Sequence, residues 1–60
     1  MTGKERHAAA ETLGRVVAQI DGGEVDAPAW YRERLIGAVI ALREGRDVDV
    51  AELSREREPR

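Results

Sequence analysis

The sequence contains no cysteine and a single histidine, His7. Without cysteine there is no disulfide, and zinc sites built from cysteine and histidine are excluded. One histidine is too few for an ordinary histidine-based metal site, so we expect neither a metal ion nor another cofactor. A chain of 60 residues usually needs a disulfide, a metal or oligomerisation to be stable, and of these oligomerisation is left.

The sequence also lacks phenylalanine, long apolar runs and a strong excess of charge of one sign. Its formal net charge of -2 argues against binding to nucleic acid or to an anionic membrane, because both normally require a basic surface. No run approaches the roughly 20 apolar residues of a membrane span. The N-terminal residues lack the apolar core of a secretory signal, so we expect a soluble, cytoplasmic protein.

Arginine supplies nine of the ten basic residues, and Lys4 is the only lysine. Together with the many alanine, glycine, valine and aspartate residues, this usage indicates a GC-rich genome, such as that of an actinobacterium or one of its phages. The abundance of arginine is then a property of the genome, which weakens a functional interpretation of any individual arginine.

A first helix is predicted over residues 3–21. Thr2 and Glu5 have the spacing of a capping box, in which each side chain accepts a hydrogen bond from the other residue's backbone N–H. Gly22 and Gly23 predict the end of the helix, since glycine readily adopts the left-handed conformation after a last turn. The apolar residues of this segment share one helical face: Ala9, Ala10, Leu13, Val16, Val17 and Ile20.

A second helix is predicted over residues 27–44. Asp26 is the candidate N-cap, and Pro28 suits the first turn because an N–H there has no partner within the helix. Gly45 predicts the end of the helix. Because the connector is short, the two helices are expected to form an antiparallel hairpin. The residues expected to pack together are Leu13, Val16, Val17 and Ile20 on the first helix and Leu35, Val39 and Leu42 on the second.

A short third helix is predicted over residues 49–57. Asp49 and Glu52 have the spacing of a capping box, and Val48 and Leu53 have that of a hydrophobic staple. The fold class is therefore all-α, an antiparallel helical hairpin plus a short C-terminal third helix.

We expect residues 1–60 to form a single small helical domain with a frayed tail at 58–60. The third helix is expected to lay Val50 and Leu53 over an end of the helical bundle. Residues 47–54 resemble the opening helix of many bacterial helix-turn-helix domains. The recognition helix that reads DNA in those domains has no counterpart in this sequence, so we interpret the segment as a generic capped helix.

The second helix has more apolar surface than one neighbouring helix can cover. Besides its core stripe, Ile36 and Ile40 form a second ridge, and Trp30, Gly37 and Ala41 form a small third patch. A helix that is apolar on several sides requires burial on more than one side. We therefore predict a protein interface at these five residues and a homodimer in which two hairpins form a four-helix bundle.

Two features of this surface have alternative explanations. Glycine inside a helix costs about 1 kcal/mol relative to alanine. Gly14 and Gly37 therefore indicate either close backbone contact across a dimer or exposed glycines tolerated in a glycine-rich proteome. Trp30 is either a contact with another protein, since tryptophan is frequent in binding hot spots, or the cap of the bundle core.

Candidate metal ligands are few in this sequence. His7 and Glu11 lie four residues apart and could share one ligand, but a metal site needs three or four protein ligands. Asp21, Glu24 and Asp26 lack the spacing of a calcium-binding loop. Helix capping and loop solubility account for these acidic residues.

Candidate catalytic groups are equally few. The pair Gly22-Gly23 follows no strand and precedes no Gly-Lys-Ser/Thr, so it is not a phosphate-binding loop. Ser54, the only serine, has no histidine beside it in the sequence. We therefore predict that the protein is not an enzyme and has no cofactor or small-molecule ligand.

The predicted function is a small non-enzymatic protein-protein interaction module, such as an adaptor, inhibitor or regulator, that acts as a helical homo-oligomer. Its partners are expected to be a second copy of itself and another protein. The alternative is a small dimeric DNA-binding regulator that uses the arginines of the third helix and the tail. Acidic residues interleave with those arginines, so nucleic acid is the less favoured partner.

Overall fold

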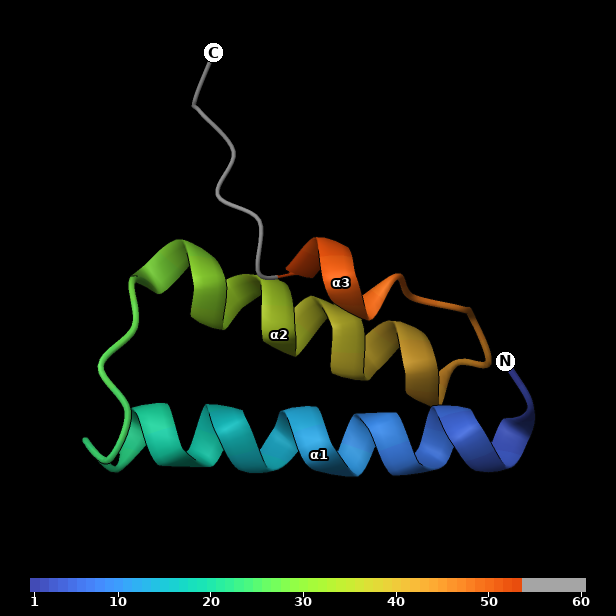
Figure 1. Cartoon of the computed structure of the whole chain (residues 1–60), viewed down its shortest axis with the longest axis horizontal. Coiled ribbons are helices and arrows are strands. Elements are labelled where there is room, and N and C mark those ends of the chain that lie inside the picture. The colour runs from blue at the N-terminus through green and yellow to red at the C-terminus, as the bar shows by residue number, and fades with distance from the viewer. Residues whose placement is uncertain (54–60) are drawn as a thin grey trace, which may run out of the picture.

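A computed structural model describes the backbone of residues 1–53 and the side chains of residues 1–50 and Leu53. Two long helices, α1 (Gly3–Asp21) and α2 (Ala29–Arg43), lie side by side and antiparallel as a hairpin, followed by a single helical turn, α3 (Val50–Leu53) (Figure 1). No helix of this described part is both long and apolar enough to cross a membrane. The all-α hairpin predicted from the sequence is therefore confirmed.

The start of α1 is fixed by hydrogen bonds between two side chains and the backbone. The N–H of Glu5 donates to Oγ1 of Thr2 at 3.1 Å, and the N–H of Thr2 donates to Oε1 of Glu5, also at 3.1 Å. These bonds form the predicted capping box. The hydrogen bond from the Thr2 backbone stabilises the charged carboxylate and lowers the pKa of Glu5.

Both long helices end in the same backbone motif. After α1, the N–H of Gly23 donates to the carbonyl of Ile20 and that of Glu24 to Gln19, at 3.2 and 2.9 Å. After α2, the N–H of Gly45 donates to Leu42, 3.1 Å away. Gly23 and Gly45 have φ values of 81° and 87°, in the left-handed region. This is the Schellman arrangement, which satisfies carbonyls at the end of a helix.

The start of α2 differs from the prediction. The helix begins at Ala29, two residues later than the sequence suggested, and its N-cap is Pro28 in an extended conformation with no side-chain capping bond. The ring of a proline disfavours helical geometry in the residue before it, so Ala27 stays outside the helix. Asp26 is therefore too far from the first turn to cap it, and its assignment as N-cap was wrong.

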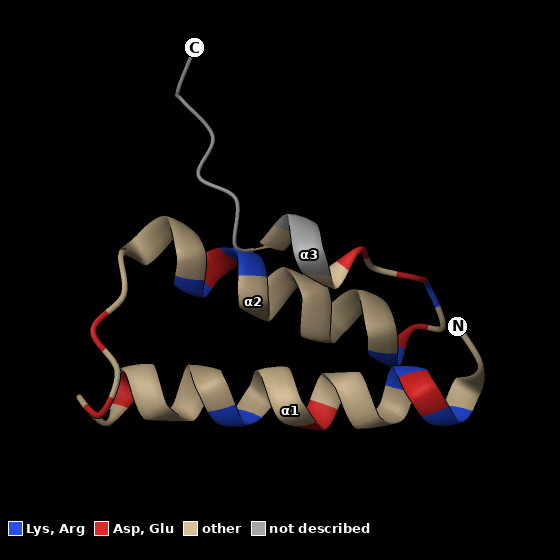
Figure 2. Cartoon of the chain, in the orientation of Figure 1, with Lys and Arg blue, Asp and Glu red and all other residues tan. Residues whose placement is uncertain are grey.

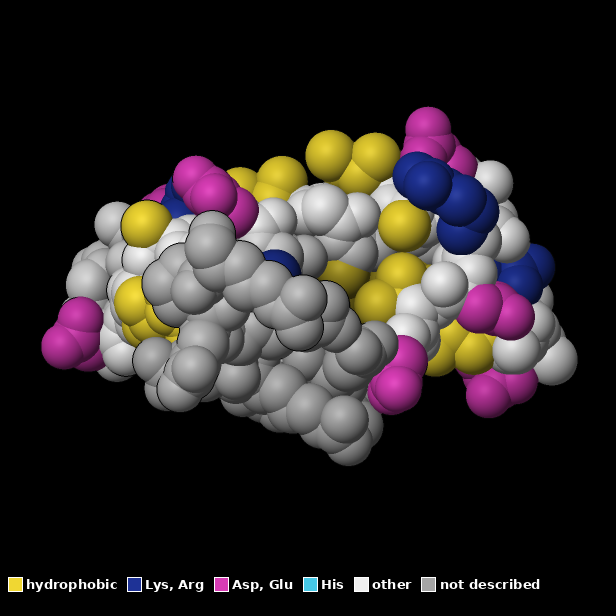
Figure 3. Space-filling model, turned by 90° about the horizontal axis from the view of Figure 1, so that it is seen from above, with side chains coloured by type: hydrophobic (Ala, Val, Ile, Leu, Met, Phe, Trp, Pro, Cys, Tyr) yellow, Lys and Arg dark blue, Asp and Glu magenta, His cyan; other side chains and the backbone are white. Residues whose placement is uncertain are grey.

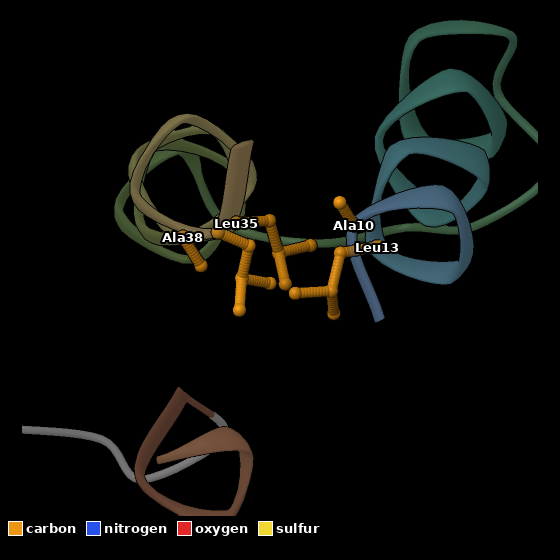
Figure 4. Close-up of a cluster of buried hydrophobic side chains, with 5 residues drawn as sticks. Ala10, Leu13, Leu35 and Ala38 are labelled. Carbon is orange, nitrogen blue, oxygen red and sulfur yellow. The ribbon is translucent and has the colours of Figure 1, made fainter. Parts of the chain in front are cut away.

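The core lies between α1 and α2. Figure 4 shows Ala10 and Leu13 of α1 beside Leu35 and Ala38 of α2, with their side chains in the space between the helices. Leu42 completes the buried cluster, and Leu35 is its most buried member, with 1% of its surface exposed. The predicted packing is confirmed, because partly buried side chains surround this cluster: Val16, Val17 and Ile20 from α1 and Val39 from α2.

The single turn α3 lies on the side of the hairpin to which the core side chains point (Figure 4). Leu53 and the preceding Val48 pack against the core, as expected for a hydrophobic staple. Val50 does not pack against the hairpin in the single chain, since 45% of its surface is exposed. One helical turn directs few of its side chains inward. The remainder of the predicted third helix, from residue 54 to 57, lies outside the described residues.

Candidate protein-binding surface

An apolar ridge, Ile36 and Ile40, lies on the side of α2 away from its buried residues. Ile36 is half-buried, and 52% of the surface of Ile40 is exposed, the largest exposed fraction of any large hydrophobic residue within the described side chains. The buried contact with α1 is made by Leu35, Ala38 and Leu42. The ridge is thus a second apolar face of α2 that the hairpin does not use.

The ridge lies in an uncharged stretch of α2 from residue 35 to 42, bounded by charged residues at both ends (Figure 2). Figure 3 views the molecule from the α2 side and shows hydrophobic side chains at this surface between basic and acidic groups. Exposed apolar side chains rimmed by charged groups are typical of protein-binding surfaces. Glu33 lies three residues before Ile36 and Arg43 three residues after Ile40, so both are in line with the ridge, and both are exposed.

Trp30 is half-buried at the start of α2 and does not belong to the core cluster or to the side chains packed against it. The guanidinium carbon of Arg34 lies 4.6 Å from the centroid of the Trp30 ring, a cation-π contact. The ring also meets Tyr31 edge to face, with centroids 5.7 Å apart. Of the two explanations offered for Trp30, the cap of the core is therefore not supported, and a contact with another protein stays a prediction.

The two glycines within helices do not bring α1 and α2 together. A Cβ atom built on Gly14 or on Gly37 would meet no other atom within 4 Å. Gly37 is exposed, and Ala41, the last of the predicted interface residues, is half-buried. Neither glycine is thus required by the packing of the hairpin itself. Close contact across a dimer and simple tolerance of glycine remain as the explanations.

At the end of the hairpin where the chain begins, a shallow hollow of about 450 Å³ lies between α1 and α2. The hollow is lined by Arg6, His7 and Arg43 together with Gly3, Ala10, Leu42 and Gly45. Nη1 of Arg6 donates to Oδ1 of Asp47 at 3.0 Å and to the carbonyl of Met1 at 2.8 Å. Arg6 therefore joins α1 to the segment after α2, and its charge is already engaged.

Asp47 holds the N-terminus of the chain as well. The terminal amine lies 3.4 Å from Oδ2 of Asp47 (Figure 1 shows the N-terminus beside the segment between α2 and α3). The hydrogen bond from Arg6 is the main cause that lowers the pKa of the Asp47 carboxyl. No local pattern predicts the contact between Arg6 and Asp47, because the two residues are 41 positions apart.

His7 and Glu11 meet as their spacing predicts, with Nε2 and Oε1 separated by 3.2 Å. Both side chains are exposed. Among the side chains that the structure describes, no three or more histidine, cysteine, aspartate or glutamate residues are grouped so that they could hold a metal ion. The pair is therefore a surface interaction along one helix.

The acidic residues near Gly22 and Gly23 do not act together. Asp21 turns to Arg32 on α2, with Nε of the guanidinium 2.6 Å from Oδ1 and Nη2 3.0 Å from Oδ2. The hydrogen bond from Arg32 is the main cause that lowers the pKa of Asp21. Glu24 and Asp26 are exposed in the connector. Arg32, a charged residue on the otherwise largely apolar α2, therefore has a partner on α1.

Comparison of the chain with protein-family models, with curated proteins and with solved structures finds no match. The arginines assigned to the alternative DNA-binding function, Arg55, Arg57 and Arg60, lie outside the described residues. The alternative DNA-binding function accordingly stays a prediction.

Proposed function

We propose that this chain is a small non-enzymatic protein-protein interaction module that works as a homo-oligomer. The observation that carries the proposal is the ridge of Ile36 and Ile40, which the hairpin leaves without a partner in the described chain although Ile40 is 52% exposed. A chain this small has a limited core, so a second copy that covers this ridge would also add stability.

The character of α1 bears on how two copies meet. The outer face of α1 is polar and exposed at Glu11, Thr12, Arg15 and Gln19. Of the two long helices, only α2 has a large apolar side chain exposed on the side away from the core. We therefore expect the four helices of a dimer to meet through α2, with each α1 on the outside.

The test of this proposal is the mass of the protein in solution, measured by size-exclusion chromatography with light scattering over a concentration series. We expect the unmodified chain to form a dimer or a larger oligomer, and Ile40→Asp to be a folded monomer by circular dichroism. The substitution places a charge in the interface, where it has no partner and loses its hydration.

Ala18→Asp is the matched control, because Ala18 and Ile40 are each the fourth residue from the end of their helix and both are exposed. The unfavourable interaction of an aspartate with the negative end of the helix dipole is thus the same in both variants. Oligomerisation should survive Ala18→Asp. An unmodified chain that is monomeric at every concentration, or an Ile40→Asp variant that oligomerises equally well, would overturn the proposal.

A further inference from the structure

Four residues form a straight stripe along the exposed side of α2: Glu33, Ile36, Ile40 and Arg43. Their separations of three, four and three residues keep them within roughly a quarter of the helix circumference, the spacing of a coiled-coil seam. Three of the four are exposed and Ile36 is half-buried. The stripe therefore extends the apolar ridge by one acidic residue at its start and one basic residue at its end.

The stripe is symmetric about its midpoint in the type of residue, and its two end residues carry opposite charges. The two isoleucines lie equally far from its midpoint, and so do Glu33 and Arg43. If two copies of α2 pack antiparallel about that midpoint, each Ile36 meets the partner's Ile40, and each Glu33 meets the partner's Arg43. If the copies pack parallel, Glu33 meets Glu33 and Arg43 meets Arg43, and both contacts are repulsive.

We propose that the occupant of the ridge is the α2 helix of a second copy, packed antiparallel about a two-fold axis at the middle of this stripe. This inference rests on the proposed function and adds the orientation and the charged contacts. Two symmetric ion pairs, each between Glu33 of one copy and Arg43 of the other, would flank the four isoleucines.

The two charged residues are available for this contact. Among the described residues, neither Glu33 nor Arg43 forms an ion pair, and both side chains are exposed. By contrast, the neighbouring Arg32 is held by Asp21. Charges that have no ion-pair partner in the described part of one chain and that are complementary across a two-fold axis favour one register and one orientation.

The contact is also small, which determines how it must be measured. The helix α2 has 15 residues and is about 22 Å long at 1.5 Å per residue. Interfaces of less than about 1,200 Å² belong to weak or transient complexes. We therefore expect a dimer that dissociates on dilution, with a dissociation constant that sedimentation equilibrium can follow.

Charge reversal tests the orientation. In an antiparallel dimer, Glu33→Arg places two arginines opposite each other at both ends, and Arg43→Glu does the same with two glutamates. Each single variant should dimerise roughly tenfold or more weakly than the unmodified chain. The double variant Glu33→Arg/Arg43→Glu restores both pairs with reversed polarity, so its dimer should approach the original affinity.

The controls separate association from folding. Arg15→Glu makes the same charge change as Arg43→Glu, but on the polar face of α1, and should leave the dimerisation constant unchanged. Circular dichroism reports whether each variant is folded at the concentrations used. Raising the salt concentration should weaken the dimer of the unmodified chain and strengthen that of Glu33→Arg, since screening reduces attraction and repulsion alike.

A thiol cross-link gives a second and independent measurement. The chain has no cysteine, so Glu33→Cys and Arg43→Cys each introduce a single thiol. When the two variants are mixed and oxidised, antiparallel packing predicts a disulfide between position 33 of one chain and position 43 of the other. Parallel packing would instead join like positions, and this result would overturn the inference.

The two failures are distinguishable. A dimer that Ile40→Asp disrupts but that cross-links at like positions, or that is insensitive to charge reversal at position 33, contradicts the antiparallel arrangement and leaves the proposed function standing. An unmodified chain that does not dimerise over the whole concentration range, together with cysteine variants that form no cross-link, removes both.

Discussion

Arg32 of α2 donates two hydrogen bonds, of 2.6 and 3.0 Å, to the carboxylate of Asp21, the last residue of α1. The bidentate geometry uses both carboxylate oxygens and fixes the plane of the guanidinium. The two residues lie on either side of the connector, so the contact joins the end of α1 to the first turn of α2. It also raises the pKa of Arg32, chiefly through the hydrogen bond with Asp21.

The pair predicts a specific dependence of stability on pH. Because Arg32 lowers the pKa of Asp21 in the folded chain, the pair adds stability at pH values above the ordinary aspartate pKa of about 3.9. That contribution is lost as the pH falls through the lowered pKa. Asp21→Asn should therefore be less stable than the unmodified chain at pH 7, and the difference should shrink toward pH 2. Urea unfolding across this range measures it.

Glu24→Gln is the control, since it removes a carboxylate from the connector next to Asp21. The Glu24 carboxylate forms no ion pair within the described part of the chain. Its free energy of unfolding should follow that of the unmodified chain. A difference between Asp21→Asn and the unmodified chain that is the same at every pH would contradict the role given to Arg32. Glu5 and Asp47 also have lowered pKa values, so some acid sensitivity should remain in Asp21→Asn.

Gly45→Ala should destabilise the protein by about 1–2 kcal/mol, because its φ of 87° lies in the left-handed region that a Cβ atom disfavours. Gly14→Ala is the matched substitution within α1, where an added Cβ meets no other atom within 4 Å. It should stabilise the chain by about 1 kcal/mol through helix propensity. Thermal or urea unfolding at one protein concentration measures both. Equal effects of the two substitutions would show that backbone conformation does not decide them.

Thr2→Ala should cost about 1 kcal/mol, because it removes the oxygen that accepts from the N–H of Glu5. Thr12→Ala makes the same change in the middle of α1, where Oγ1 of Thr12 donates to the carbonyl of Ala8 at 3.0 Å on the exposed side. That position should gain a few tenths of a kcal/mol, since alanine is the better helix former. Urea unfolding measures the free energy of unfolding of both variants. Equal values would contradict a stabilising role for the Thr2 cap.

The boundaries of the helices that depend on neighbouring residues were predictable. The capping box of Thr2 and Glu5 and the ends at Gly23 and Gly45 involve partners no more than five residues apart, so the sequence carries all the information. The late start of α2 also has a local cause, because Pro28 disfavours helical geometry in the residue before it.

The candidate binding surface was predicted in part. Helical periodicity separated Ile36 and Ile40 from the core stripe, and their exposure in the folded chain agrees with that assignment. Periodicity could not say whether Trp30 joins the core, because its position at the start of α2 borders both faces. Trp30 contacts Arg34 and belongs neither to the core cluster nor to the side chains packed against it.

The sequence by itself determined that the chain forms two amphipathic helices, where each ends and that they turn back on one another, because these properties depend on backbone geometry and on the pattern of apolar residues within one segment. Only the tertiary structure decided that Trp30 lies outside the core cluster and which charges are engaged by distant partners. Arg32 is held by Asp21 and Arg6 by Asp47, while Glu33 and Arg43 form no ion pair in the part of the chain that is described. These relationships depend on the relative placement of segments that sequence periodicity leaves free.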